Sequence, residues 1–314
     1  QLGIGNYNDQ NSLVKMPNST GLVPKQIACG DLHTMLLMND ASGSIYGMGN
    51  NQYGQLGVLI YSLVQMINAT GKTPKQVVCG RSHTVVLMND ASGTIYVTGR
   101  NNNGQLGIGN TTDVSGLVIM PIPTGKVPKQ VACGQYHTMV LMNDASGSIY
   151  GTGYNEYGQL GIGNTTDVSG LVIMTIPAGK VPSQVVCGQF YTMVLMNDAS
   201  GSIYGTGYNG NDQLGLGNTT DQNLLTQLIN PTGKVPSQIA CGGDGFTMII
   251  MNDASGSIYG TGYNFYGQIG LGYTSGNTIS RSLPTLIPNT TGKVPKQVAC
   301  GCATDFTMVL MNDA

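Results

Sequence analysis

The chain has 314 residues, of which 47 are Gly and none is Trp, and its formal net charge at neutral pH is −2. Only 9% of the residues are charged, against ~25% in ordinary soluble domains. A net charge of −2 does not provide the basic surface that binds nucleic acid. The lack of an apolar run of ~18–20 residues argues against a membrane helix. The regular recurrence of short apolar blocks argues against disorder.

An internal repeat runs through the whole sequence, and such repeats are the first guide to the fold. The stretch LMNDASGSIYGTGYN begins at Leu141, and close variants begin at Leu37, Leu87, Leu195 and Ile250. The tripeptide Gln-Leu-Gly or Gln-Ile-Gly begins at Gln1, Gln55, Gln105, Gln159, Gln213 and Gln268. We therefore expect a single domain over residues 1–314, built from six repeats of about 50–59 residues that start near these glutamines.

One repeat can be followed in chain order from its apolar blocks and turn residues. Strands are predicted at KQVACG (129–134), HTMVLM (137–142), SIYGTGY (148–154) and GLVIMTIP (170–177). The turn NDASG (143–147) predicts a hairpin, because Asn, Asp and Ser form local hydrogen bonds and Gly accepts a positive φ. No segment has a sustained apolar period of 3.6 residues, so we expect almost no helix. Four short strands in each tandem repeat predict an all-β fold, and a β-propeller is favoured over a β-solenoid because a closed ring leaves only short, protected strand edges.

These repeats carry a family resemblance. The segment VACGQYHTMVLMNDASGSIYGTGYNEYGQLGIGN resembles the repeat of the regulator-of-chromosome-condensation (RCC1-like) family in its Cys-Gly, its His-Thr, its Gly turn and its Asn-x-x-Gly-Gln-Leu-Gly. The resemblance covers essentially the whole chain and implies a propeller that usually has seven blades. The chain departs from that pattern in its six repeats and between Tyr150 and Tyr154, where the family's usual Trp is replaced.

The two ends of the sequence predict how the ring is completed. Repeat material starts at QLGIGN and stops at LMNDA, so a piece equivalent to SGSIYGTGYNxYG is missing between them. We expect six four-stranded blades, the last of which is a composite of both ends and lacks one strand. The alternative is that sequence beyond this chain supplies the strand and a seventh blade.

Because strand direction alternates, the connections of the repeat sort onto two faces. The turns NDASG and TGKVPKQ fall on one face, which we call the turn face and which holds nine of the ten lysines. This mixed-charge surface is predicted to be a solvated rim, or alternatively a repetitive docking surface for subunit assembly.

The loops CGxxH and YNxYGQLGIGNTTD fall on the opposite face, the loop face, where the sequence varies most. Variable loops on a rigid scaffold are where propellers present binding sites. The predicted binding residues are Asp31, His33, Arg81, His83, Tyr136, His137, Phe190, Tyr191, Asp244, Phe246, Asp305 and Phe306. Arg100, Glu156, Asp212, Phe265 and Tyr266 are expected on the same face.

Catalytic and metal chemistry is weakly represented. Six of the seven cysteines occupy one strand position in successive repeats, where free Cys acts as a small buried hydrophobe. His33, His83 and His137 are equivalent in three repeats and could hold Zn or Cu, but the other copies carry Tyr191, Phe246 and Phe306, which favours a packed planar ring. The chain has one Glu and no phosphate-binding loop ahead of a helix, so we expect no enzyme, no cofactor and no metal.

Six Asn-x-Ser/Thr sequons could accept glycans, and they stand at Asn18, Asn68, Asn110, Asn164, Asn218 and Asn289. Exposed acceptors of this kind suit an extracellular or virion-surface protein rather than a cytoplasmic one. The amino-acid composition of the repeats, rich in Asn, Ile and Tyr, also resembles that of paralogous repeat proteins of this family encoded by giant amoeba-infecting viruses. This resemblance would imply a virion or surface component.

The leading interpretation is a non-enzymatic propeller that binds a protein partner or assembles with itself, without nucleic acid or membrane insertion. The alternative is a guanine-nucleotide exchange factor for a small GTPase, which the resemblance implies as the founding activity of the family. That activity needs a wedge-sized insertion between blades, and no repeat carries one. Photoreception, as in the plant ultraviolet-B receptor of this family, needs a Trp cluster that the chain lacks.

Overall fold

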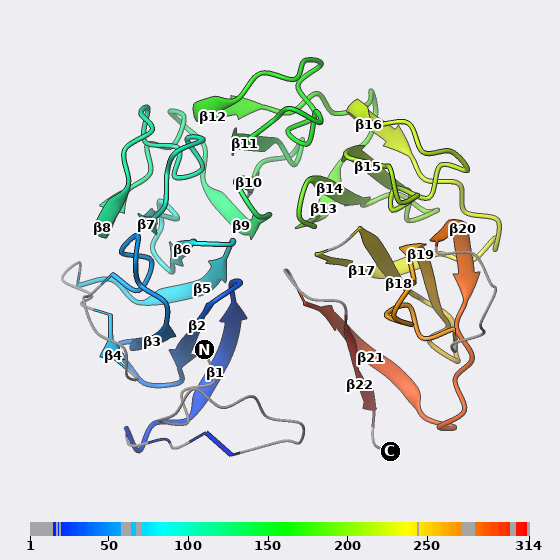
Figure 1. Cartoon of the computed structure of the whole chain (residues 1–314), viewed down its shortest axis with the longest axis horizontal. Coiled ribbons are helices and arrows are strands. Elements are labelled where there is room, and N and C mark those ends of the chain that lie inside the picture. Colours follow the sequence, from blue (N-terminus) through cyan, green and yellow to red (C-terminus); the bar gives the residue numbers. More distant parts are fainter. Residues whose placement is uncertain are drawn as a thin grey trace.

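The computed structural model describes residues 15–16, 18, 20–57, 64–66, 71–243, 245–271, 280–301 and 306–312. Their regular structure consists of five four-stranded sheets and one two-stranded sheet, all antiparallel. The sheets stand around a common centre as the blades of a propeller (Figure 1). This arrangement confirms the predicted all-β propeller. In the described part of the chain, no helix is long and apolar enough to cross a membrane.

Each complete blade uses four consecutive strands, and the first strand lies nearest the centre (Figure 1). The first strands are β1 (Pro24–Cys29), β5 (Pro74–Cys79), β9 (Pro128–Cys133), β13 (Pro182–Cys187), β17 (Pro236–Gly242) and β21 (Val294–Cys300). The second strands are β2 (His33–Met38), β6 (His83–Met88), β10 (His137–Met142), β14 (Tyr191–Met196), β18 (Phe246–Met251) and β22 (Thr307–Asn312). The third strands are β3 (Ile45–Gly49), β7 (Ile95–Gly99), β11 (Ile149–Gly153), β15 (Ile203–Gly207) and β19 (Ile258–Tyr263). The outer strands are β4 (Val64–Gln65), β8 (Val114–Ile119), β12 (Val168–Ile173), β16 (Gln222–Gln227) and β20 (Ser280–Leu286).

The expected number of blades is wrong for the described residues, because they form five complete blades rather than six. Blades 1 to 5 start at β1, β5, β9, β13 and β17, and the sixth repeat forms only the sheet β21–β22. The segment from Gln1, expected to supply the outer strand, lies outside the described residues. The described strands therefore form an arc with β1 at one end and β21–β22 at the other (Figure 1).

The second strand of each complete blade is the most buried, because it has a strand on either side and a neighbouring blade against its face. All six residues of β10 are buried, and its bounds are those predicted from HTMVLM. The predicted outer strand at 170–177 lies instead at 168–173, since it follows its pairing with β11, in which Val168 is opposite Gly153 and Ile173 opposite Tyr150. The chain then leaves the strand so that Met174 can enter the core.

The hydrophobic core is divided into clusters, most of which lie between adjacent blades. One cluster joins Met193, Ile203 and Leu214 of blade 4 to Ile239 and Tyr259 of blade 5, and the other interfaces repeat this pattern. The cysteines of the first strands belong to these interfaces. Cys79, Cys133 and Cys241 are buried as expected, Cys187 and Cys300 are partly buried, and Cys29 on β1 is exposed. Burial raises the pKa of the Cys300 thiol to about 12, so this group remains protonated.

Candidate functional site

The loop face rests on a row of backbone hydrogen bonds that joins blades 1 to 4. The amide of Asp31 donates to the carbonyl of Arg81 (3.3 Å), Arg81 donates to Gln135 (3.2 Å), and Gln135 donates to Gln189 (3.1 Å). Each of these residues follows a Cys-Gly pair, so blades 1, 2 and 3 each hold the equivalent loop of the next blade. The side chains that follow are therefore displayed in fixed positions over blades 1 to 4.

Two arginines on the loop face are held against tyrosine rings. The Arg81 guanidinium pairs with Asp31 (Nε to Oδ2, 2.9 Å), donates to the Tyr136 hydroxyl and lies 5.7 Å from the centre of that ring. Arg100, directly after β7, lies between Tyr53 and Tyr136 at 5.2 and 5.4 Å from the ring centres. Burial raises the pKa of the Asp31 carboxyl, and Arg81 opposes that rise. The arginines are thus oriented by cation–π contacts and remain partly exposed.

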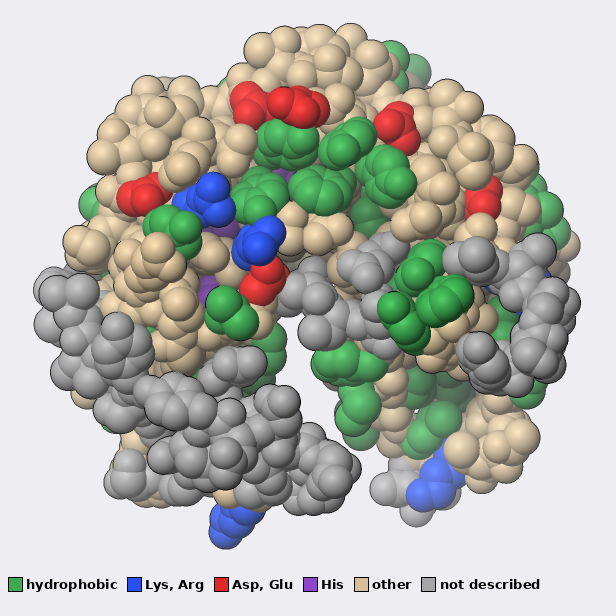
Figure 2. All heavy atoms as spheres, viewed as in Figure 1, with side chains coloured by type: hydrophobic (Ala, Val, Ile, Leu, Met, Phe, Trp, Pro, Cys, Tyr) green, Lys and Arg blue, Asp and Glu red, His purple; other side chains and the backbone are tan. Residues whose placement is uncertain are grey.

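A cluster of aromatic rings continues from the arginines across blades 3 and 4. Phe190 lies 6.1 Å from Tyr136, 5.8 Å from Tyr154 and 5.4 Å from Tyr157 between ring centres. Tyr157 also contacts Tyr208 at 5.1 Å. Figure 2 shows the resulting hydrophobic patch on this face, beside basic side chains. We call Tyr53, Arg81, Arg100, Tyr136, Tyr154, Tyr157, Phe190 and Tyr208 the aromatic–arginine face.

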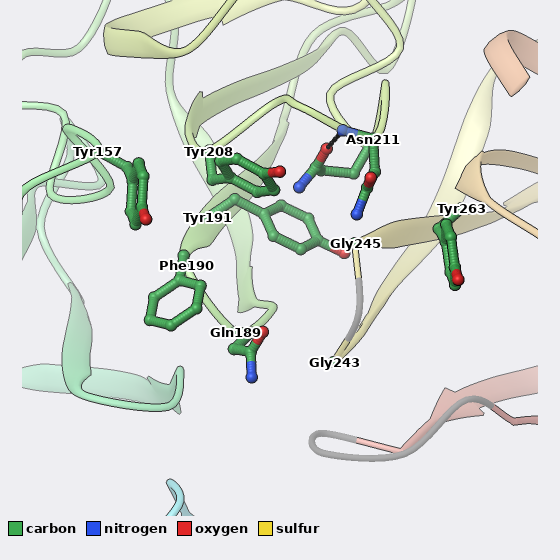
Figure 3. Close-up of a pocket in the computed structure, with 10 residues that line it drawn as sticks. Tyr157, Gln189, Phe190, Tyr191, Tyr208, Asn211, Gly243, Gly245 and Tyr263 are labelled. Atoms are coloured by element: carbon green, nitrogen blue, oxygen red, sulfur yellow. Dashed lines mark hydrogen bonds between the residues drawn. The ribbon is translucent and has the colours of Figure 1, made fainter. Parts of the chain in front are cut away.

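A hollow of about 460 Å³ opens beside this cluster, between blades 4 and 5. The rings of Tyr157, Phe190 and Tyr208 line one side, and Tyr263 stands across from them (Figure 3). The buried side-chain amide of Gln213 also lines the hollow, and its Nε2 has no hydrogen-bond partner. The Nε2 atoms of Gln105, Gln159 and Gln268 are in the same state, so this feature belongs to the repeat rather than to the hollow. The hollow is large enough for a side chain of a docked protein.

Five of the predicted binding residues lie beneath the surface. His33, His83, His137, Tyr191 and Phe246 are fully buried. Each ring packs on the Gly of its own Cys-Gly pair, where an added Cβ would come within 1.9–2.2 Å of a ring atom. A partner docked on the loop face cannot reach the histidines or Phe246, whereas Tyr191 also lines the hollow between blades 4 and 5 (Figure 3).

The histidines form links between blades rather than a metal site. Nε2 of His83 lies 3.0 Å from Oγ1 of Thr138 in the next blade, and His33 and His137 make the equivalent contact at 3.1 Å. Burial lowers the pKa of His33 to about 4 and those of His83 and His137 to about 3, so all three are neutral at pH 7. Among the described residues, no group of three His, Cys, Asp or Glu side chains could hold a metal ion.

The other predicted residues are distributed differently. Asp31, Arg81, Tyr136 and Phe190 belong to or flank the aromatic–arginine face, and Phe306 is exposed next to β22. Asp244 and Asp305 lie outside the described residues. The sequence interpretation overlooked the tyrosines Tyr53, Tyr154, Tyr157 and Tyr208. A signal was present, because the tyrosines of the GTGY and NxYG segments follow the third strands and so fall on the same face as the loops after Cys-Gly.

The sequons can be located for five of the six asparagines. Asn18, Asn110, Asn164, Asn218 and Asn289 are exposed, and Asn68 lies outside the described residues. The side-chain amides of Asn18 and Asn289 donate to the backbone carbonyls of Leu22 and Lys293. A glycan at either site would thus attach to a nitrogen that is already hydrogen-bonded.

Comparison with known proteins agrees with this architecture. Residues 1–313 match the family model of the RCC1-like domain. The ultraviolet-B receptor UVR8 of Arabidopsis thaliana is 32% identical over 303 residues, which are 96% of this chain and 54% of the receptor. An RCC2 homolog from Xenopus laevis is 33% identical over 147 residues, which are 47% of this chain and 28% of that protein. The chain therefore spans about half of the plant receptor's length and less of the frog protein's.

Two solved structures share the fold. Human WBSCR16 superposes with a TM-score of 0.78 at 24% identity, covering 92% of this chain and 72% of that one. Prp20p of Saccharomyces cerevisiae gives 0.73 at 20% identity, covering 87% of this chain and 66% of that one. These two likenesses show the propeller fold alone. With the family model matched over nearly the whole chain and the repeats folded as propeller blades, the chain belongs to the family of RCC1-like domains.

Proposed function

We propose that the chain is a non-enzymatic propeller that binds a protein partner through its aromatic–arginine face. The observation that carries this proposal is the continuous cluster of tyrosine, phenylalanine and arginine side chains across blades 1 to 4, whose Cys-Gly loops are hydrogen-bonded to one another. Tyr, Phe and Arg are enriched at the centres of protein interfaces, where a few such residues supply most of the binding energy. The RCC1-like family is one of protein-interaction domains, which supports the same interpretation.

The rigidity of the aromatic–arginine face favours its interpretation as a binding surface over its interpretation as ordinary solvent-exposed surface. Arg81 is fixed by Asp31 and Tyr136, and Arg100 is enclosed by two rings, so little side-chain entropy remains to be lost when a partner docks. The glutamate nearest the cluster, Glu156, accepts a hydrogen bond from Tyr154 (2.7 Å). An acidic or aromatic side chain of the partner would complement the exposed arginine edges and the neighbouring hollow.

Affinity capture with matched variants tests this proposal. The chain and the double variant Tyr136→Ala/Phe190→Ala would be used to capture proteins from cells that express the chain, with Lys129→Ala on the turn face as the control. We expect at least one captured protein to be reduced about tenfold or more by the double variant and to be unchanged by Lys129→Ala. The same captured proteins at the same levels with both variants would contradict the proposal.

We further propose that the protein acts as a glycosylated component of an extracellular or particle surface. The Asn-, Ile- and Tyr-rich composition of its repeats, which resembles that of repeat proteins encoded by giant viruses, is in line with this role. Five exposed sequon asparagines support this location. Intact mass spectrometry of the native protein, with light scattering of the native particle, tests it. Hexose mass on the sequon peptides within a large assembly is the expected result, and an unmodified monomer would contradict it.

The exchange-factor alternative rests on relatives rather than on this site. The structural study of Prp20p concerns its binding to Gsp1p and histones, and the likeness of this chain to Prp20p extends to the fold only. Of the acidic residues considered for GTPase contact, Asp31 is engaged by Arg81, and the other two lie outside the described residues. Release of a fluorescent nucleotide from small GTPases of the source organism would reveal this activity.

A further inference from the structure

The hollow between blades 4 and 5 opens where two positions that hold aromatic rings in the neighbouring blades hold none. The residue before the second strand is Phe190 in blade 4, and its counterpart in blade 5 is Gly245. The position that Tyr157 occupies in blade 3 is taken by Asn211 in blade 4, and the backbone amides of both donate to a Gln side chain. The row of rings is thus interrupted by a hollow of about 460 Å³, and Tyr263 stands on its far side (Figure 3).

The wall of the hollow contains an amide that lacks a hydrogen bond. Gln213 is fully buried, its side chain lines the hollow, and its Nε2 has no hydrogen-bond partner. A Cβ on Gly245 would lie 2.8 Å from this nitrogen, and the φ of Gly245 is +93°, a conformation that residues with side chains rarely adopt. Glycine at this position therefore places no side-chain atoms over the amide. An occupant of the hollow that carries an acceptor can supply the hydrogen bond that the amide lacks.

An equivalent glutamine elsewhere shows what is particular to this place. Nε2 of Gln105 in blade 2 also lacks a partner, and its Oε1 accepts from the backbone amide two residues before it (3.0 Å), as Oε1 of Gln213 does (3.0 Å). The blade after Gln105 carries Tyr136 where the blade after Gln213 carries Gly245. Gln105 does not line the hollow. The two glutamines therefore match in their own loops and differ in what the next blade places beside them.

The charge around the hollow favours a neutral occupant. None of the described residues that line it is charged. Burial raises the pKa of Tyr208, and the negative charge of Asp221 adds to the rise, so the Tyr208 hydroxyl stays protonated. An anion would meet this negative charge without any cation in the described lining. A cation has no acceptor to offer to the Gln213 amide.

The shape and chemistry of the walls match a sugar ring. Phe190 and Tyr208 each contact Tyr157, at 5.4 and 5.1 Å between ring centres, and the three rings form one continuous wall. A pyranose presents C–H groups on its faces, which pack on aromatic rings, and hydroxyl groups around its rim, which both donate and accept hydrogen bonds. The rim would meet the amides of Gln189 and Gln213 and the tyrosine hydroxyls. The volume of about 460 Å³ lies in the ordinary range of small-ligand sites.

We propose that this hollow binds a neutral sugar, either free or as the terminal unit of a glycan. The sugar ring packs against the wall of Tyr157, Phe190 and Tyr208, and one of its hydroxyls accepts a hydrogen bond from Gln213 Nε2. A phenylalanine side chain would also pack on these rings, but it would leave the Gln213 amide without an acceptor. The proposal goes beyond the proposed function, because a sugar would bind without any protein partner. The site shares three rings with the aromatic–arginine face and extends past it to Gln213 and Tyr263.

Direct titration with defined sugars tests the proposal. Methyl glycosides of glucose, galactose, mannose and N-acetylglucosamine would be titrated into the whole chain, and binding followed by calorimetry and by saturation-transfer NMR. We expect at least one of them to bind saturably, with saturation transfer strongest at the C–H groups that lie on the aromatic rings. Neutral oligosaccharides that end in the same sugar distinguish its source. Equal or tighter binding of the oligosaccharide identifies the terminal unit of a glycan as the ligand, and weaker binding identifies a free sugar.

Three protein variants locate the site. Tyr208→Ala removes one ring of the wall and should weaken sugar binding about tenfold or more. Gln213→Met removes the amide and should weaken binding about two- to tenfold, which corresponds to one hydrogen bond. Gln105→Met makes the same change in blade 2 and should bind the sugar as the parent chain does. No saturable binding of any of the sugars, or equal binding by the parent chain and all three variants, would overturn the proposal. Equal losses for the two glutamine variants would overturn it as well, and the capture of a protein partner would stand as a separate result.

Discussion

At the scale of single residues, the core of each blade depends on a matched pair on the second and third strands. In blade 3, Met139 is opposite Gly151, and a Cβ on Gly151 would lie 2.9 Å from the Met139 sulfur. Blades 1, 4 and 5 have the same Met and Gly pair. Blade 2 instead pairs Val85 with Val97, and both are fully buried. A large Met opposite a Gly and a Val opposite a Val thus fill the same space in the core of the blade.

This pairing predicts a non-additive double-mutant cycle. Gly151→Val alone should overfill the core and cost about 1–3 kcal/mol of unfolding free energy. Met139→Val alone should leave a cavity and cost about 1–2 kcal/mol. The double variant reproduces the solution of blade 2, so we expect it to recover most of both losses, with a coupling energy of about 1–2 kcal/mol. Urea unfolding of the four proteins measures this, and additive losses would show that the two positions do not compensate.

At the scale of elements, the hairpin turn of each blade is organised by one aspartate. In the turn after β10, Asp144 Oδ1 accepts from the Ser148 amide (2.9 Å) and the Ser146 hydroxyl (2.9 Å), and Oδ2 receives Lys126 Nζ (2.6 Å). Burial opposes ionisation of this carboxyl, but hydrogen bonds from Lys126, Ser148 and Ser146 outweigh it and hold the Asp144 pKa well below its usual range. Lys126 belongs to the connection that leads into β9. Its ion pair with Asp144 therefore joins that connection to the hairpin turn after β10.

We expect the aspartate to matter more than its lysine. Asp144→Ala removes the acceptors of the turn and should cost about 1–2 kcal/mol of unfolding free energy. Asp144→Asn keeps one acceptor oxygen and should cost less. Lys126→Gln should cost least, because the ion pair is partly exposed to solvent and the turn keeps its other hydrogen bonds. With the pKa lowered in the folded state, the contribution of Asp144 is complete above its ordinary pKa of 3.8 and is lost as pH falls below that value. Urea unfolding at neutral pH and near pH ~3 measures both effects, and equal losses for Asp144→Ala and Lys126→Gln would refute this order.

Individual elements also show how far the sequence could predict the structure. The strand at 137–142 was predictable to the residue, because a continuous apolar run lies between a Gly-containing loop and an Asn-Asp turn. The outer strand was displaced because it is half-exposed, and its ends depend on pairing with β11 rather than on its own composition. The site was predictable as a face but not as a set of residues. Tyr136 and His137 are adjacent in the sequence, yet only contact with the next blade makes His137 buried and leaves Tyr136 on the surface.

At the scale of the whole molecule, three buried histidines connect successive blades around the centre. The hydroxyl of Thr138 donates its proton to the Gln105 carbonyl (2.8 Å), so Nε2 of His83 must donate to Thr138 Oγ1. The bond of Thr84 to Gln55 (2.8 Å) implies the same arrangement for His33. Nδ1 of each histidine is buried and has no hydrogen-bond partner. A second proton would have to enter at this nitrogen, in a place without an acceptor, which is why burial keeps these rings neutral.

The propeller should therefore lose stability in mild acid. The pKa of each histidine is depressed in the folded state, to about 4 for His33 and about 3 for His83 and His137, from 6.5 in the unfolded chain. Above pH 6.5 both states are neutral and stability is complete; below it the unfolded chain binds protons that the folded chain refuses. Each histidine then lowers the unfolding free energy by up to about 1.4 kcal/mol per pH unit. His83→Phe places at this position the residue that blade 5 carries, and Thr138 keeps its bond to Gln105. Urea unfolding between pH ~4 and ~7 should show about a third less pH dependence for this variant than for the parent chain, whereas equal slopes would mean that the histidines do not control acid stability.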